Sequence, residues 1–190
     1  MILCDSEIRA ALKYGQIIID PMPSPDDFTT TAVDLRLGDT DFKRWRKTGP
    51  GVSLIIDPSQ KGFYRDAIAF LEDVPRQIDG SVVIGPDEFL LALTRERVEL
   101  PERSRVAARV EGKSSLARIG LVVHLTAPTI HSGFKGNITL EIKNHGYLPI
   151  KLRPGMPICQ LIFESVFGTP SATMQGIFQE QRSVEGTASH

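Results

Sequence analysis

One short segment gathers several groups that bind anions. Residues 111–126 read Glu-Gly-Lys-Ser-Ser-Leu-Ala-Arg-Ile-Gly-Leu-Val-Val-His-Leu-Thr, so a Gly-Lys-Ser-Ser turn precedes one helical turn that ends at Gly120. Such a turn directs backbone N–H groups toward one spot, where Lys113 and Arg118 add positive charge. The segment therefore predicts a binding site for a phosphate chain. It is not a Walker A loop, because the first glycine of that motif is missing and no long helix follows.

A second group of candidates lies further along the chain. Residues 138–142 (Ile-Thr-Leu-Glu-Ile) alternate apolar and polar side chains, so Thr139 and Glu141 should share the strand face turned away from the core. A glutamate on such a face is usually a solvated surface residue, and periodicity alone does not make it catalytic. In the same way, Ser114 and its neighbour could simply cap a helix, and Arg118 could form a surface ion pair.

Histidine and cysteine show no metal-binding pattern. The histidines at positions 124, 131, 145 and 190 and the two cysteines, Cys4 and Cys159, lack the spacing of a zinc site. The His-x-Glu and Pro-Cys-x-x-Cys elements of zinc-dependent nucleobase deaminases are missing. A Gly-x-Ser-x-Gly nucleophile turn is missing too. We therefore expect neither a protein-bound metal nor Ser-His-Asp catalysis.

The elements that must position these groups are mostly short strands. Apolar runs separated by Pro, Gly, Asp or Glu are typical of an antiparallel sandwich or barrel rather than of βαβ units. The predicted strands are 17–19, 33–38, 52–56, 82–84, 89–93, 98–100, 106–110, 138–142, 148–152 and 158–163. A short amphipathic helix is predicted from Cys4 to Gly15, and residues 62–73 are ambiguous.

Composition narrows the class of protein. With 190 residues, of which 41% are hydrophobic, one domain can bury a sizeable core. The net charge of −1 gives no basic field for nucleic acid, so we interpret the basic run 43–47 as a solvated loop. Two cysteines, no signal peptide and no long apolar run predict a soluble cytoplasmic protein that binds no membrane.

Several motifs together resemble the dCTP deaminases of the dUTPase superfamily. They occupy residues 3–5, 33–38, 111–121, 124–127, 133–136, 139–142, 153–156 and 160–164. The resemblance implies a mainly β fold, a distorted β jelly roll or β-clip barrel like that of dUTPases, with a short N-terminal helix. It also implies that residues 1–164 form the deaminase domain and that residues 165–190 form a flexible tail closing over an active site.

The resemblance further implies a homotrimer that deaminates dCTP to dUTP and ammonia, in the biosynthesis of dUMP and dTMP. Its active sites would lie between subunits, with Mg²⁺ bound through the substrate triphosphate and no zinc. Glu141 would be the general acid/base, with Ser114 and Arg118 beside the reacting atoms. The substrate-binding residues would be Lys113, Ser114, Ser115, Leu116, Ala117, Arg118, Thr139, Leu140, Glu141, Gln160 and Gln181.

Two alternatives remain beside a plain deaminase. Relatives that also hydrolyse dUTP, and dUTPases, usually carry an aspartate before the Gly-Phe/Tyr-x-Gly turn, where this chain has His131. Losing that carboxylate disfavours a bifunctional enzyme that forms dUMP, although many plain deaminases also have the aspartate. The other alternative is a non-catalytic nucleotide-binding regulator of the same fold. Inhibition by dTTP, as in relatives, and the choice between dCTP and CTP stay open.

Overall fold

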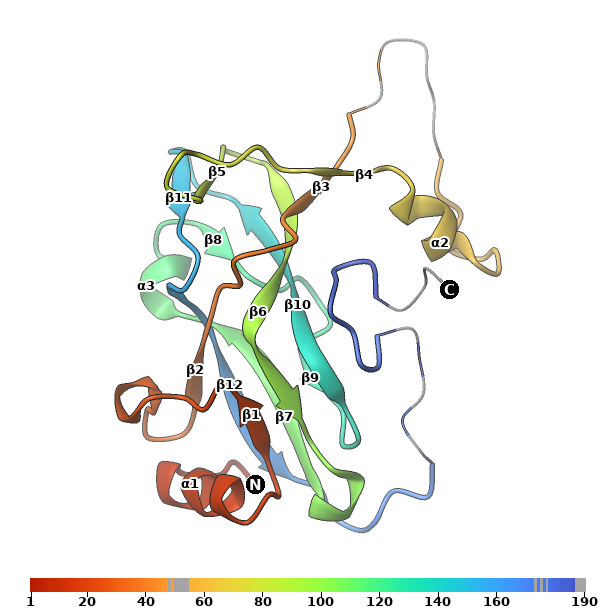
Figure 1. Ribbon diagram of the computed structural model, residues 1–190. Helices are drawn as coiled ribbons and strands as arrows, with labels where there is room; N and C mark the ends of the chain where they lie inside the picture. Colours follow the sequence, from red (N-terminus) through yellow and green to blue (C-terminus); the bar gives the residue numbers. More distant parts are fainter. Residues whose placement is uncertain (48, 50–54, 173, 175, 177, 187–190) are drawn as a thin grey trace.

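The protein is built from antiparallel strands. The computed structural model describes residues 1–47, 49, 55–172, 174, 176 and 178–186 (Figure 1). The strands are β1 Ile18–Asp20, β2 Val33–Arg36, β3 Lys43–Trp45, β4 Leu71–Asp73, β5 Val82–Ile84, β6 Phe89–Glu99, β7 Val106–Gly112, β8 Leu121–Val122, β9 Thr129–Ile130, β10 Lys135–Asn144, β11 Ile150–Leu152 and β12 Pro157–Ser165. The α-helices are α1 Asp5–Lys13, α2 Phe63–Ile68 and α3 Ser114–Ala117.

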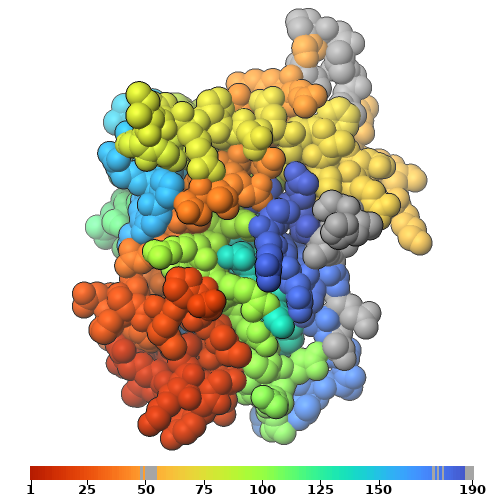
Figure 2. Space-filling view, in the orientation of Figure 1, coloured from red at the N-terminus to blue at the C-terminus, as the bar shows by residue number. Residues whose placement is uncertain are grey.

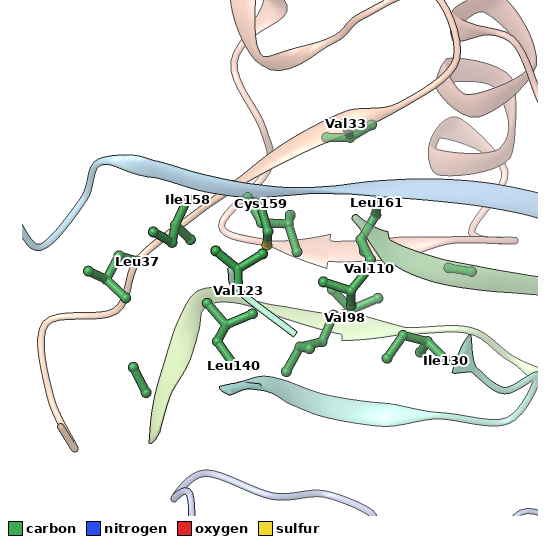
Figure 3. Packing of buried hydrophobic residues seen from close by; sticks show 14 of the residues in the cluster. Val33, Leu37, Val98, Val110, Val123, Ile130, Leu140, Ile158, Cys159 and Leu161 are labelled. Atoms are coloured by element: carbon green, nitrogen blue, oxygen red, sulfur yellow. The ribbon is translucent and has the colours of Figure 1, made fainter. Parts of the chain in front are cut away.

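Two sheets enclose the core. The larger sheet has the order β4-β3-β6-β10-β8, with β1 also paired to β6, and the other has the order β2-β12-β7-β9. Strands β5 and β11 form a separate pair. Figure 3 shows Cys159 and Leu161 from β12 and Leu140 from β10 in the space between the sheets. Each such buried apolar side chain stabilises the fold by about 1.5–3 kcal/mol. The mainly β prediction is confirmed.

The alternating pattern of β10 is confirmed and is longer than predicted. Ile138, Leu140 and Ile142 are at most 3% exposed, and the residues between them are only half-buried. The strand pairs with β6 on one side and β8 on the other. One face of β10 therefore belongs to the core, and the opposite face is left for other contacts.

Residues 89–93 and 98–100 are predicted as two strands but form one, β6. The pairing with β10 shifts between Arg97 and Leu93, so β6 carries an irregularity where the sequence suggests a break. The Thr94 hydroxyl stabilises this irregularity, because it accepts a hydrogen bond from the N–H of Ile138 (2.9 Å) and donates one to the Glu96 carbonyl (2.8 Å). The charged residues of this stretch interrupt the hydrophobic pattern without ending the strand.

The prediction of a solvated loop for the basic run is wrong for Lys43–Trp45, which form β3. Lys43 Nζ lies 2.9 Å from Asp73 Oδ1, and Arg44 Nε donates to Glu72 Oε1 (2.8 Å). Both acidic partners come from β4, so the neighbouring strand compensates the positive charge that composition alone suggested was solvated.

The remaining predictions concern the N-terminal helix, the ambiguous segment 62–73 and the strand 52–56. Helix α1 is confirmed, with Ile8 and Ala11 buried, whereas the ambiguous segment splits into α2 and β4. Of the predicted strand 52–56, residues 52–54 lie outside the described residues, and Ile55 and Ile56 are exposed and belong to no strand. None of the described helices is long and apolar enough to cross a membrane.

The C-terminal tail lies along β10 of its own chain. Glu180 N–H donates to the Lys135 carbonyl (2.5 Å), and Gln179 Nε2 donates to the Gly133 carbonyl (2.7 Å). Figure 2 shows this segment, in dark blue, lying against β10 and against the residues around α2. That the tail moves in solution stays a prediction.

Candidate active site

The outer face of β10 carries Thr139 and Glu141. The register with β6 puts Thr139 opposite Leu93 and Glu141 opposite Leu91. Because successive side chains of a strand point to opposite faces, both polar residues leave the sheet on the side away from Leu140 and the core. The strand thereby holds a hydroxyl and a carboxylate two residues apart on one surface.

A backbone group orients the Glu141 carboxylate. Leu125 N–H donates to Oε2 of Glu141 (3.0 Å), while Oε1 accepts no hydrogen bond from any described residue. One oxygen is fixed in place, and the other remains available to exchange a proton. This arrangement suits a general acid/base, which needs a defined position and an accessible oxygen.

A cavity of about 460 Å³ lies beside Glu141. Trp45, Tyr64 and Phe178 contribute aromatic walls, and His131 adds a polar group. The volume falls within the range of about 300–1,000 Å³ typical of small-molecule sites. The cavity thus combines apolar walls with a few polar groups, as a site for an aromatic polar ligand does.

Two polar atoms at this cavity have no partner among the described residues. Thr139 Oγ1 and Gln181 Oε1 are both buried and make no hydrogen bond with any residue that the structure describes. Buried polar atoms are nearly always hydrogen bonded in native proteins, so an exception calls for a ligand or a water molecule. Both residues line the cavity, which makes a polar ligand their natural partner.

The tail forms one wall of the cavity. Gln181 is only 3% exposed, and its Nε2 donates to the Asn137 carbonyl (2.6 Å). Phe178 packs edge-on against Tyr64, with ring centroids 5.3 Å apart. Burial, with a smaller effect of the nearby Glu185 and Glu141 charges, raises the pKa of Tyr64, so its phenol stays neutral.

The Gly-Lys-Ser-Ser segment leads into one helical turn, α3, as predicted. This turn lies away from the cavity beside Glu141 of the same chain. Ser114 and Arg118 are exposed, and neither lines the cavity beside Glu141. Gly120 ends the helical turn with φ +89°, and a Cβ there would lie 2.3 Å from the Gly146 nitrogen. Only glycine fits this position, which fixes how α3 meets the loop after β10.

Strand β2 and strand β12 hold the base of this turn. Lys113 forms an ion pair with Asp34, and Gln160 Nε2 donates to the Gly112 carbonyl (3.3 Å). Asp34 and Gln160 face each other across the β2–β12 pair. Asp34 and Gln160 therefore hold the start of the turn in position. The Ser114 and Ser115 hydroxyls and the Arg118 guanidinium are exposed.

The predicted site residues fall into two groups in a single chain. Thr139, Glu141 and Gln181 meet at the cavity, whereas the segment 113–118 and Gln160 lie elsewhere. Leu140, predicted to bind substrate, has its side chain in the core at 0% exposure. Any contact of Leu140 with a ligand must come from its backbone.

Sequence patterns missed the aromatic walls and His131. Trp45 lay inside a run interpreted by its charge alone, and Tyr64 in a segment with no clear periodicity. His131 directly precedes the Ser132-Gly133 turn, and its departure from the aspartate of relatives was the available signal. Within the described ranges, no three His, Cys, Asp or Glu side chains lie together as metal ligands.

Comparison with known sequences identifies close relatives. A family model described as dCTP deaminase-like matches residues 2–166. A protein of Methanosphaera stadtmanae named "dCTP deaminase, dUMP-forming" is 41% identical over 166 residues, which cover 87% of this chain and 79% of that protein. A Rhodospirillum rubrum protein named "dCTP deaminase" is 42% identical over 173 residues, covering 90% and 86%.

Solved structures share the fold. The 2'-deoxycytidine 5'-triphosphate deaminase of Agrobacterium tumefaciens superposes with a TM-score of 0.62 at 24% identity, covering 85% of this chain and 47% of that one. A dUTPase of phage phi11 of S. aureus superposes with a TM-score of 0.50 at 13% identity, covering 84% and 96%. The predicted dUTPase-like fold is confirmed by these superpositions.

Proposed function

The chain belongs to the dCTP deaminase-like family, and on that premise we propose that it hydrolyses dCTP to dUTP and ammonia. The observation that carries the proposal is the Glu141 carboxylate, held by the Leu125 N–H at the wall of a nucleoside-sized cavity. Thr139 Oγ1 and Gln181 Oε1 lie at the same cavity and have no partner in the described part of the chain, which supports contacts with a polar ring.

The reaction needs one group that both accepts and donates protons. Water attacks C4 of the cytosine ring, and Glu141 accepts its proton as the C–O bond forms, because free water has a pKa of about 15.7. The carboxyl then protonates N3. Glu141 next moves the proton of the new C4 hydroxyl to the amino group, so that the C4 carbonyl forms as the C4–N bond breaks and ammonia leaves. One water molecule enters and one ammonia leaves, so atoms and charge balance.

The second group of predicted residues comes from another subunit in this proposal. Ser114 and Arg118 are exposed and lie away from the Glu141 cavity of their own chain. A homotrimer with sites between subunits would bring them to a neighbour's cavity, Ser114 to hold the attacking water and Arg118 to orient the carboxylate. The segment 113–118 would then hold the triphosphate, bound as its magnesium complex, with no zinc involved.

A bifunctional enzyme is the second candidate, and the names of relatives favour it. The Methanosphaera protein is named as dUMP-forming, although the equally similar Rhodospirillum protein is not. His131 lines the cavity of this chain where a carboxylate would be needed to direct a second water. We therefore place plain deamination first.

Separating the products tests these proposals together. The purified protein is incubated with dCTP and Mg²⁺, and dCTP, dUTP, dUMP and pyrophosphate are separated by chromatography. Accumulated dUTP supports plain deamination, and dUMP with pyrophosphate supports the bifunctional enzyme. Unchanged dCTP, with dCTP binding measured by calorimetry, would instead indicate the non-catalytic regulator. Adding dTTP or replacing dCTP with CTP in the same assay tests inhibition and sugar specificity.

A further inference from the structure

We infer that Val184 is a positioning residue for Gln181, and that Asp41 and Tyr64 hold Val184 in place. The inference rests on the proposed function for its catalytic consequence, but its structural part does not. Val184 contacts no reacting atom; it acts by fastening the tail so that Gln181 stays at the wall of the cavity.

Val184 is fully buried although the residues on either side of it are mostly polar. Its exposure is 0%, and it packs with Leu91 and Leu93 from the outer face of β6. Partly buried Leu71 and Phe89 complete this cluster, which is separate from the core between the sheets. Leu91 and Phe89 also line the cavity beside Glu141, so the cluster joins Val184 of the tail to a wall of that cavity.

Both backbone groups of Val184 are hydrogen bonded to residues outside the tail. Its N–H donates to Asp41 Oδ2 (2.5 Å), and its carbonyl accepts the Tyr64 hydroxyl (3.0 Å). Buried backbone groups must find partners, and these two side chains supply them. Asp41 adopts a left-handed conformation with φ 61°, which few residues other than glycine, asparagine and aspartate tolerate.

Tyr64 links this anchor to the cavity. Its ring packs against Phe178 and its hydroxyl holds Val184, so one residue contacts the tail on both sides of Gln181. Between Gln181 and Val184 there are only Arg182 and Ser183, and three residues of chain span at most about 10 Å. Movement at Val184 is therefore transmitted to Gln181 and to its bonds with Asn137.

The expected effect is on apparent affinity. If only part of the population has the tail in place, the apparent dissociation constant rises in inverse proportion to that fraction. Once substrate has recruited the tail, the chemistry at Glu141 is unchanged. Loosening the anchor should raise KM and leave kcat nearly constant.

Kinetics of Val184→Ala and Tyr64→Phe test this expectation. Val184→Ala should raise the KM for dCTP about tenfold with kcat changed less than about twofold, and Tyr64→Phe, which loses only the hydroxyl, should raise KM about threefold. Val83→Ala and Tyr147→Phe are matched controls, because these side chains are 40% and 95% exposed and lie outside the tail contacts. A fall in kcat with unchanged KM would overturn the inference.

A double substitution separates positioning from general stability. If Val184 acts through Gln181, Val184→Ala should cause no further loss in a Gln181→Ala background. Additive losses would mean that Val184 acts independently of Gln181, and the inference would fail. Thermal unfolding of each variant checks that the fold is intact.

Hydrogen exchange without nucleotide gives a readout independent of activity. Asn137 N–H donates to the Gln181 carbonyl (3.1 Å), whereas the neighbouring Ile138 N–H donates to Thr94 Oγ1 inside the sheet. In Val184→Ala the Asn137 amide should exchange about tenfold faster while Ile138 is unchanged. Unchanged exchange at Asn137 would refute the anchor, even in an active enzyme. A wild-type protein inactive on dCTP would refute the proposed function and leave this exchange result standing.

Discussion

Gln181 and Asn137 are joined by two hydrogen bonds, one through a side chain and one through the backbone. Gln181 Nε2 donates to the Asn137 carbonyl (2.6 Å), and Asn137 N–H donates to the Gln181 carbonyl (3.1 Å). Asn137 lies on the same outer face of β10 as Glu141. The tail and the strand that carries the proposed catalytic group therefore meet through a paired contact, and the chemistry of that contact can be altered one atom at a time.

Gln181→Glu should lower kcat/KM for dCTP at least as much as Gln181→Ala does. The glutamate has nearly the same shape, but a carboxylate oxygen would replace the amide nitrogen that donates to the Asn137 carbonyl. Two acceptors would then face each other in a buried place, which costs about 1–3 kcal/mol, or roughly 5- to 150-fold in kcat/KM. Steady-state kinetics with dCTP measures both variants, and a glutamate variant with near wild-type kcat/KM would contradict the role of this hydrogen bond.

Glu141→Gln should retain dCTP binding and lose turnover. The amide oxygen can still accept the Leu125 N–H, so the geometry persists, but the group no longer accepts a proton. General acid/base catalysis is worth about 10²–10⁴-fold, and a loss of that size in kcat is expected. Calorimetry should give a dissociation constant within about threefold of wild type.

The matched control for this variant is Glu99→Gln. Glu99 is a partly buried glutamate on β6 of the same sheet, paired with Arg97 at 3.3 Å. It should keep near wild-type turnover. If Glu141→Gln keeps turnover as well, Glu141 is not the general acid/base.

Mixing two inactive variants should restore activity if sites lie between subunits. Glu141→Gln lacks the carboxylate and Arg118→Ala lacks the guanidinium, and the two residues are separate in one chain. In every cyclic trimer that contains both variants, one site takes its carboxylate and its guanidinium from subunits that retain them, so about a third of the sites in the dual-purified protein would be intact. The two variants are co-expressed with different tags, and dual-purified protein is assayed with dCTP. Activity no greater than that of either variant alone would show that both groups serve the same subunit's site.

The sequence predicted the strand that carries the site better than the walls around it. Alternation along residues 138–142 is a local property, and it placed Thr139 and Glu141 correctly on the outer face of β10. The register irregularity in β6 was not predicted, because Thr94 stabilises it through a long-range hydrogen bond to Ile138. Local periodicity cannot report a partner that lies 44 residues away in the chain.

The cavity walls escaped prediction for a related reason. Trp45 and Tyr64 come from segments whose own patterns are charged or mixed, and only their packing against β6, β10 and the tail gives them a place. Val184 lies in a stretch of polar composition, and its burial depends on Leu91 and Leu93 in another part of the chain. Such positions carry no local signal of a site.

Asp27→Asn should remove a source of stability that depends on pH. Burial opposes ionisation of the Asp27 carboxyl, but bonds from Ser24 (2.7 Å) and Arg36 (2.6 Å) outweigh it, so its pKa lies below the ordinary value. A group with a lowered pKa stabilises the fold above its unfolded-state pKa of about 3.9, and this is lost as the pH falls through the folded-state value.

Thermal unfolding between pH 7 and pH 2.5 measures this contribution. Wild type should be more stable than Asp27→Asn by roughly 1–3 kcal/mol at pH 7, and the difference should shrink below about pH 4. Asp26→Asn changes the exposed neighbouring carboxylate and should cause little change at any pH. A difference that stays constant down to pH 2.5 would show that the charge of Asp27 is not its cause.

His131→Asp should shift the products from dUTP toward dUMP. His131 lines the cavity, and a carboxylate there would give the site a second acceptor able to hold and deprotonate a water molecule near the phosphates. We expect wild type to release dUTP and the variant to raise the ratio of dUMP to dUTP about tenfold. His145→Asp, in an exposed loop outside the cavity, is the matched control. If wild type already forms dUMP as its main product, His131 does not limit dUTP hydrolysis and the bifunctional alternative holds.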